Sequence, residues 1–116
     1  MLWIRIAATI GLLGVAFGAF GAHALRGRVE PNLLSAYQTG VLYHLIHAVA
    51  LFALSLYARA TTSSILWPGA LWLAGMLLFS GSLYAMALTG VTKLGVVTPL
   101  GGLCLLGGWA ALFMVR

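Results

Sequence analysis

The sequence predicts an all-α integral membrane protein, a single four-helix bundle with up-down-up-down topology over residues 1–116. Of its 116 residues, 63% are hydrophobic and 6% are charged, whereas soluble domains are near half apolar and about a quarter charged. Four apolar runs are each long enough to cross a bilayer core about 30 Å thick, which takes about 20 helical residues. Because the connections are short, consecutive helices are predicted to be antiparallel neighbours.

The first two helices are predicted over residues 2–25 and 33–57. The first run is interrupted only by Arg5 and ends in the polar stretch 26–31. The second run follows Pro31, whose fixed φ suits a first helical turn. A cluster of threonine and serine then predicts a turn after this helix.

The last two helices are predicted over residues 65–88 and 95–115. Ser64 is expected to cap the third helix, with Pro68 in its first turn and Gly90 just past its end. The fourth helix leaves two alternatives open. Either Thr98 caps a helix that begins at Pro99, or Pro99 kinks a longer helix.

The basic residues divide evenly between the two predicted membrane faces. Three of them share a face with both termini, and three lie on the opposite face (Arg5, Arg59 and Arg116; Arg26, Arg28 and Lys93). Basic residues at the ends of apolar runs indicate contact with lipid headgroups, so we expect the lipid bilayer and no nucleic acid as a partner. The even division leaves the orientation in the membrane undecided. Aromatic residues nearer the terminal face predict an interface belt there (Trp3, Tyr57, Trp67, Trp72 and Trp109).

Small residues form stripes on three of the predicted helices. At 100° per residue, the members of each stripe share one face. The stripes are Ala7, Gly11, Gly14, Gly18 and Gly21; Ala70, Ala74, Gly81 and Ala85; and Val97, Gly101, Cys104, Gly108 and Ala111. Such faces let helix backbones approach closely within a bundle. The alternative is that the glycine faces assemble a homo-oligomer or line a narrow pore.

The second predicted helix carries two histidines near the middle of the bilayer. Tyr37, His44 and His47 share one face, which should point into the bundle because unsatisfied polar groups are costly in hydrocarbon. In one interpretation, the imidazoles are neutral and bond Tyr84, a serine or a backbone carbonyl, which fixes the register of the helices. In another, they line a polar cavity for a small molecule or an ion.

The candidate ligand-binding residues are therefore intramembrane histidines and tyrosines (His47, His44, Tyr37, His23 and Tyr84). A shared metal ion is a further hypothesis, because His44 and His47, three residues apart, can both reach one ion. His23 lies nearer the loop, about 15 Å from the depth of His44 by helical rise. We expect it to pair with Tyr37 or with loop backbone.

Several kinds of chemistry lack the residues that they require. Glu30 is the single carboxylate and lies in a predicted loop, which excludes paired-carboxylate hydrolysis and a carboxylate calcium cage. Cys104 is the single cysteine, which excludes an intrachain disulfide and a cysteine zinc site. A dyad of His44 or His47 with a serine is conceivable, but Gly-Ser pairs in membrane helices are usually packing residues. The sequence therefore predicts no enzyme and no cofactor.

Several separate motifs, in order along all four predicted helices, resemble the YgdD-like family of small membrane proteins, a domain of unknown function. These motifs are Gly18–His23, Thr39-Gly40 with Tyr43-His44 and His47-Ala48, Phe79–Tyr84, and Thr98–Gly102 with Gly108-Trp109. The resemblance implies a four-helix protein of the bacterial inner membrane, with a eukaryotic relative. It supplies no reaction.

The function expected from the sequence is that of a non-enzymatic structural or accessory component of the bacterial inner membrane. The alternative is a binding or transport module for a small molecule, ion or metal that uses the intramembrane histidine and tyrosine cluster. The two differ in whether the imidazoles are sealed within the protein or reached by a ligand.

Overall fold

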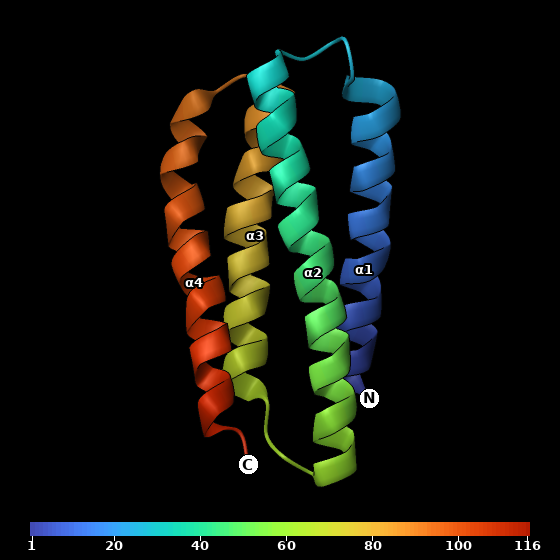
Figure 1. Ribbon diagram of the computed structural model, residues 1–116, viewed down its shortest axis with the longest axis vertical. Coiled ribbons are helices and arrows are strands. Elements are labelled where there is room, and N and C mark those ends of the chain that lie inside the picture. Colours follow the sequence, from blue (N-terminus) through green and yellow to red (C-terminus); the bar gives the residue numbers. More distant parts are fainter.

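The computed structural model describes residues 1–116 as four long helices packed side by side (Figure 1). Each helix, with its flanking turns, is long and apolar enough to cross a membrane. The elements are α1 (Leu2–Phe20), the π-helical turn η1 (Gly21–Leu25), α2 (Pro31–Thr61), α3 (Leu66–Thr89), the 3₁₀ turn η2 (Thr92–Val96), α4 (Val97–Ala111) and the 3₁₀ turn η3 (Leu112–Met114). The predicted fold class is confirmed.

The bundle is flattened, with α2 and α3 in the middle and α1 and α4 at the edges. Its extents are 47 × 26 × 16 Å, and the helices follow the order α4, α3, α2, α1 across Figure 1. Of the apolar stretch of each span, 44% is buried inside the bundle in α3, but only 11% in α1 and 17% in α4. Both edge helices therefore present most of their surface to lipid.

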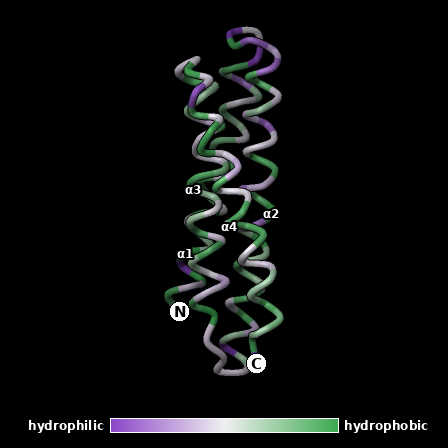
Figure 2. Tube along the Cα trace, turned by 90° about the vertical axis from the view of Figure 1, so that its left-hand side faces the viewer, coloured by the Kyte–Doolittle hydropathy of each residue, from purple (hydrophilic) through white to green (hydrophobic).

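Both termini and the α2–α3 loop lie at one end of the bundle, here called the terminal end. The α1–α2 and α3–α4 connections lie at the other, the loop end. In Figure 2, hydrophilic residues concentrate toward these ends, and α1 and α3 lie on one side of the bundle with α2 and α4 on the other. This arrangement agrees with the predicted antiparallel topology and with basic residues at both ends.

The central helix α2 is longer than predicted at both ends. It begins at Pro31. The N–H groups of a first helical turn have no partner within the helix, so a proline, which lacks an N–H, costs no hydrogen bond there. It ends because Thr62 adopts a left-handed conformation with φ of +57°. Thr61 still belongs to the helix, and its hydroxyl donates to the Tyr57 carbonyl oxygen at 2.9 Å.

The start of α3 corrects the predicted cap. Ile65, not Ser64, occupies the N-cap position, and no side chain bonds the free N–H groups there. Ile65 is 2% exposed, so apolar burial fixes this end of the helix in place of a serine cap. The other end agrees with the prediction, because Gly90 has φ of +73° and its N–H donates to the Met86 carbonyl oxygen.

The first alternative for the start of the fourth helix, a Thr98 cap before Pro99, is wrong, because α4 begins at Val97 and continues the 3₁₀ turn η2. Pro99 is the third residue of α4, in the first turn, where a proline costs the helix no hydrogen bond. Thr98 does not cap the helix. Its hydroxyl instead shares a hydrogen bond of 2.6 Å with the Ser82 hydroxyl of α3.

Glycines bring α3 and α4 close together. A Cβ on Gly101 would collide with the backbone of Phe79, and one on Gly75 would lie 2.5 Å from the Leu105 side chain. A Cβ on Gly108 would collide with the Trp72 ring. Glycines of the predicted stripe on α4 therefore pack within the chain.

The stripe predicted on α1 also packs within the chain, whereas the one predicted on α3 differs. A Cβ on Gly14 would lie 2.7 Å from the Leu45 side chain, and one on Gly21 would collide with the Tyr37 ring. On α3 the Trp3 ring packs on Gly69, which lies outside the predicted stripe. A Cβ on Gly81, which belongs to that stripe, would meet no other atom within 4 Å.

Candidate functional site

The polar face of α2 points into the bundle, as predicted. Tyr37 is fully buried, and His44 and His47 are 8% and 4% exposed. The two histidines lie on either side of the midpoint of α2, so both are near the middle of the membrane. Their hydrogen-bond partners must therefore come from within the protein.

His44 joins three helices through its two ring nitrogens. Its Nε2 lies 2.8 Å from the Ile10 carbonyl oxygen of α1. A carbonyl oxygen only accepts, so Nε2 carries the hydrogen. In the neutral ring Nδ1 then accepts from the Tyr84 hydroxyl of α3, at 2.8 Å. Both predicted kinds of partner, Tyr84 and a backbone carbonyl, are therefore present.

Two further side chains extend this network. The Tyr37 hydroxyl donates to the Phe17 carbonyl oxygen of α1 at 2.5 Å, and the Ser80 hydroxyl donates to the Gly40 carbonyl oxygen of α2 at 2.6 Å. The Tyr37 and Tyr84 rings lie 4.9 Å apart. We call Tyr37, His44, Ser80 and Tyr84 the polar seam, because their bonds join α1, α2 and α3 along the bundle.

His47 faces the other edge of the bundle. Its Nδ1 donates to the Tyr43 carbonyl oxygen one turn earlier, at 2.7 Å. Its Nε2 accepts from the indole N–H of Trp109 on α4, at 3.0 Å. The two histidines are thus held in opposite tautomers, His44 by partners on α1 and α3 and His47 by partners on α4 and on α2 itself.

Trp72 completes a tryptophan cluster with His47 and Trp109. Its ring lies 4.7 Å from that of Trp109 and 5.9 Å from that of His47, both edge to face. Trp72 is 1% exposed, and its Nε1 has no hydrogen-bond partner. The predicted interface belt is wrong for Trp72, which is a core residue, and Trp109 directs its polar group inward. Tyr57 and Trp67 are exposed, as expected.

His23 does not join the other candidates. It lies in η1 and is exposed. The expected pairing with Tyr37 does not form, because the Tyr37 hydroxyl donates to Phe17 instead. The structure therefore brings Tyr37, His44 and Tyr84 together, turns the His47 ring toward α4, and leaves His23 at the loop end.

The arrangement does not fit a shared metal ion. The lone pair of each imidazole already accepts a hydrogen bond, from Tyr84 at His44 and from Trp109 at His47. The rings turn toward different helices. No place in the fold gathers three histidine, cysteine or carboxylate side chains. Coordination would require both hydrogen bonds to break.

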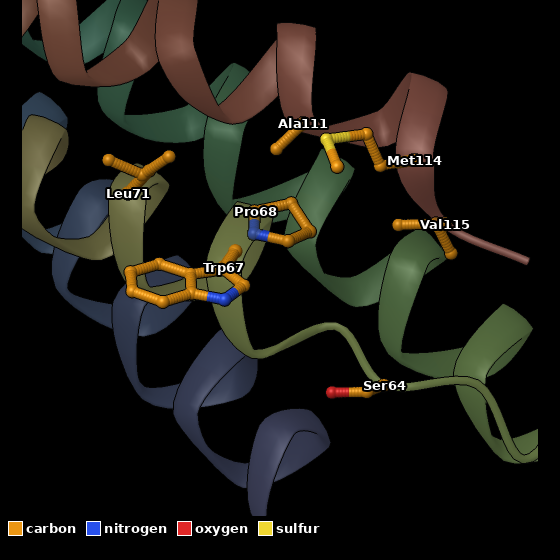
Figure 3. Close-up of a pocket in the computed structure, with 7 residues that line it drawn as sticks. All are labelled: Ser64, Trp67, Pro68, Leu71, Ala111, Met114 and Val115. Atoms are coloured by element: carbon orange, nitrogen blue, oxygen red, sulfur yellow. The ribbon is translucent and has the colours of Figure 1, made fainter.

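Clefts occur on the surface of the bundle, and those beside the histidines are apolar. One cleft of 470 Å³ at the terminal end lies between the start of α3 and the end of α4, where Trp67, Pro68 and Met114 line it (Figure 3). It contains none of the candidate residues. His44 borders a groove of 270 Å³ between α1 and α3, and His47 borders one of 540 Å³ between α2 and α4.

Sequence comparison gives relatives that match almost the whole chain. Residues 17–102 match the family described as "Protein of unknown function (DUF423)". The UPF0382 membrane protein YwdK of Bacillus subtilis is 41% identical over 109 residues, which cover 92% of this chain and 89% of that protein. The UPF0382 membrane protein SAB0533 of Staphylococcus aureus is 36% identical over 113 residues, covering 97% and 93%.

A eukaryotic protein is among the relatives. The UPF0382 membrane protein C1782.12c of the fission yeast Schizosaccharomyces pombe is 39% identical over 116 aligned positions, covering 95% of this chain and 97% of that protein. No solved structure matches the chain. With four apolar spans and this coverage, the chain is a multi-pass membrane protein that belongs to the DUF423 (UPF0382) family, whose molecular function is unknown.

Proposed function

We propose that the chain is a non-enzymatic structural or accessory component of the bacterial inner membrane, whose intramembrane polar groups hold its helices in register. The observation that carries the proposal is that all four nitrogens of His44 and His47 have partners inside the chain. To act as an acid or base or to bind cargo, an imidazole needs a lone pair or proton that can reach the ligand. Neither histidine offers one without breaking a bond between or within helices.

The absence of a second carboxylate supports the same proposal. Glu30 lies at the loop end, where its carboxylate accepts a hydrogen bond from the Asn32 side chain at 3.4 Å. Ser80 and Ser82 direct their hydroxyls to carbonyl oxygens and to Thr98. A serine nucleophile needs a histidine within reach to take its proton, and neither serine bonds His44 or His47.

The alternative of a histidine-lined transport module makes a different prediction. The purified protein should then carry a metal ion or chromophore, or proteoliposomes that contain it should show a flux of ions. His47→Ala should lose that signal. We expect neither. Elemental analysis, visible absorbance and flux assays should give the same result for the wild type and for His47→Ala. The free energy of unfolding should be lower in His47→Ala. Stoichiometric cargo that depends on His47 would overturn the proposal.

The predicted homo-oligomer needs a surface other than the glycine stripes of α1 and α4. Gly14, Gly21, Gly101 and Gly108 all pack against neighbours within the chain. A stable mass equal to one chain in detergent is therefore the expected result, measured by light scattering after subtraction of the detergent. A mass of two or more chains, which falls to that of one chain when a bulky residue is placed on the lipid-facing surface, would instead favour a homo-oligomer.

A further inference from the structure

The groove between α1 and α3 has no occupant from the chain itself. It measures 270 Å³, which is larger than the cavity of about 150 Å³ that accommodates benzene in a protein core. Ile10 and Phe17 line it on α1, Leu73 and Gly81 on α3, and His44 and Tyr84 form the polar part of its wall. Because His44 and Tyr84 bond each other, a molecule in this groove meets a surface that is apolar in effect.

Gly81 lies beside this groove and has no structural reason within the chain to be glycine. A Cβ on it would meet nothing within 4 Å. The other glycines with no neighbour, Gly27 and Gly90, have positive φ values and occupy turns. Glycine weakens the interior of a helix, and at Gly14, Gly101 and Gly108 close packing offsets that loss. We infer that the space beside Gly81 is filled from outside the chain.

The shape of the groove selects a slim occupant. The Phe17 and Tyr84 rings stack at 4.5 Å and close it toward the loop end. The Trp3 ring packs on Gly69 and closes the α1–α3 interface toward the terminal end. A helix of a second copy, about 10 Å wide and long enough to span the membrane, does not fit between these two contacts. A single hydrocarbon chain does.

A second cleft extends the groove to a cationic side chain. It measures 270 Å³, includes Arg5 and Thr9, and shares Ile10 and Leu73 with the first groove. Arg5, in the first turn of α1, has no carboxylate side chain nearby, because Glu30, the only acidic residue, is the N-cap of α2 at the loop end. An arginine one turn inside a membrane helix extends its guanidinium to the headgroup layer, where an anionic group can pair with it.

The distance along the bundle matches one leaflet. The helices α1 and α3 run in the same direction, and the Phe17–Tyr84 stack places Gly81 level with Gly14. The rise from Arg5 to Gly14 is nine residues, or about 14 Å. Half of a hydrocarbon core about 30 Å thick is about 15 Å. A chain whose headgroup lies at Arg5 therefore reaches the space beside Gly81.

We propose that this continuous groove binds one anionic phospholipid from the leaflet at the terminal end. Its phosphate pairs with the Arg5 guanidinium, and one acyl chain runs past Ile10 and Leu73 to the space beside Gly81. This binding is independent of the proposed function, because the lipid contacts only the lipid-facing side of the polar seam and needs no free nitrogen on either histidine.

Native mass spectrometry of the detergent-purified protein tests the headgroup half of the proposal. The protein is titrated with phosphatidylglycerol and with phosphatidylcholine that carry the same acyl chains. We expect one phosphatidylglycerol to bind about fivefold more tightly than phosphatidylcholine, the scale of a partly exposed charge-assisted bond. Arg5→Gln should abolish this preference. Arg28→Gln, which removes an exposed cation at the loop end, should retain it. Equal preferences in Arg5→Gln and Arg28→Gln would overturn the proposal.

A second pair of variants tests the position of the acyl chain. Gly81→Leu fills an open space and should fold, but it should lose the bound phosphatidylglycerol. Gly102→Leu makes the same change in the groove between α2 and α4, where a Cβ would lie 3.8 Å from the Phe79 ring. This variant should keep the lipid. Unchanged lipid occupancy in Gly81→Leu would disprove the acyl position. A change of subunit number in Gly81→Leu without loss of lipid would assign the groove to a second copy.

Discussion

The two edge helices, α1 and α4, are held to the bundle in different ways. Carbonyl oxygens of α1, at Ile10 and Phe17, accept hydrogen bonds from side chains of α2. The helix α4 instead approaches α3 so closely that Gly101 lies against the backbone of Phe79. Lipid offers helices little hydrophobic drive to associate, so close packing and hydrogen bonds supply it. Glycines also pack closely at the α1 edge, and hydrogen bonds of Thr98 and Trp109 also reach α4, but a glycine pressed against a neighbouring backbone occurs only at the α4 edge.

The difference predicts different responses to substitution. A substitution at a hydrogen-bonding side chain removes only the bonds of that side chain. Such bonds in membrane proteins each contribute about 0.6 kcal/mol to stability on average, with a maximum near 1.7. A backbone in contact with another backbone cannot move aside for a new side chain. The α3–α4 interface should therefore respond more steeply to a single change than the α1–α2 interface.

Gly101→Leu should have the largest effect on stability. Its side chain would meet the main chain of Phe79, so α4 must move away from α3 and the Trp109 bond to His47 must break. We expect the free energy of unfolding to fall by more than about 3 kcal/mol, beyond the usual range for overpacking. Unfolding in mixed micelles of increasing denaturing detergent measures it.

Gly102→Leu is the matched control for this substitution. It places the same side chain one residue further along α4, where a Cβ has ordinary contact distance to Phe79, and it should lower stability by less than about 1 kcal/mol. If Gly101→Leu and Gly102→Leu unfold alike, backbone contact does not hold α4 in place.

His44→Leu should rank second. It removes both bonds of the ring and leaves the Tyr84 hydroxyl without its acceptor in an apolar setting, so stability should fall by about 2–3 kcal/mol. Unfolding of the variant in the same micelles checks the value. His23→Leu is the control, and it should change stability by less than about 0.5 kcal/mol because its side chain is exposed. Equal losses in both variants would contradict the bridging role of His44.

The spans, their antiparallel order and the inward direction of the histidine face could be predicted from the sequence. These features follow from length, hydrophobicity and the cost of a polar group in hydrocarbon. Local backbone rules also predict Pro31 at the start of α2 and Gly90 after α3. Each of these inferences needs only the segment itself and the solvent around it.

The partners of the histidines could not be predicted in full. Positions 44 and 47 differ by 60° around a helix of 3.6 residues per turn, and this small angle turns the rings toward different neighbours. That separation decides whether two imidazoles share an ion or bond to Tyr84 and Trp109. A position near a helix end predicts an interface role for Trp72, but Gly108 on α4 makes room for its ring in the core. Such pairings depend on how two distant segments pack.

Trp109→Phe tests the single side-chain bond that links α4 to His47. The variant keeps an aromatic ring beside Trp72 and loses the N–H that His47 Nε2 accepts at 3.0 Å. We expect a loss of about 1 kcal/mol in the free energy of unfolding, smaller than that of His44→Leu because His47 keeps its bond to Tyr43. A loss as large as that of Gly101→Leu would mean that a hydrogen bond, not backbone contact, dominates this edge.

The smallest effects should come from a pair of serines that differ in where their hydroxyls point. The Ser80 hydroxyl crosses from α3 to α2 and donates to the Gly40 carbonyl oxygen at 2.6 Å. The Ser82 hydroxyl donates within α3, to the Phe79 carbonyl oxygen at 2.9 Å, and so leaves Thr98 to donate across the interface. A carbonyl oxygen in a helix keeps its backbone donor when a side chain is removed, so neither alanine variant leaves that oxygen unpaired.

Ser80→Ala should therefore lower the free energy of unfolding by about 0.6 kcal/mol, the average for a bond between membrane helices. Ser82→Ala should lower it by less, because the Thr98 hydroxyl can turn back to a carbonyl of its own helix, as threonines in helices commonly do. The free energy of unfolding is measured in the same micelles for each serine variant alone and combined with His44→Leu. The coupling energies then show which serine acts together with the α1 edge. Ser80→Ala should couple to His44→Leu, since both belong to the polar seam, and Ser82→Ala should add independently. Coupling of equal size for the two serines would mean that the seam and the α4 interface act as one unit.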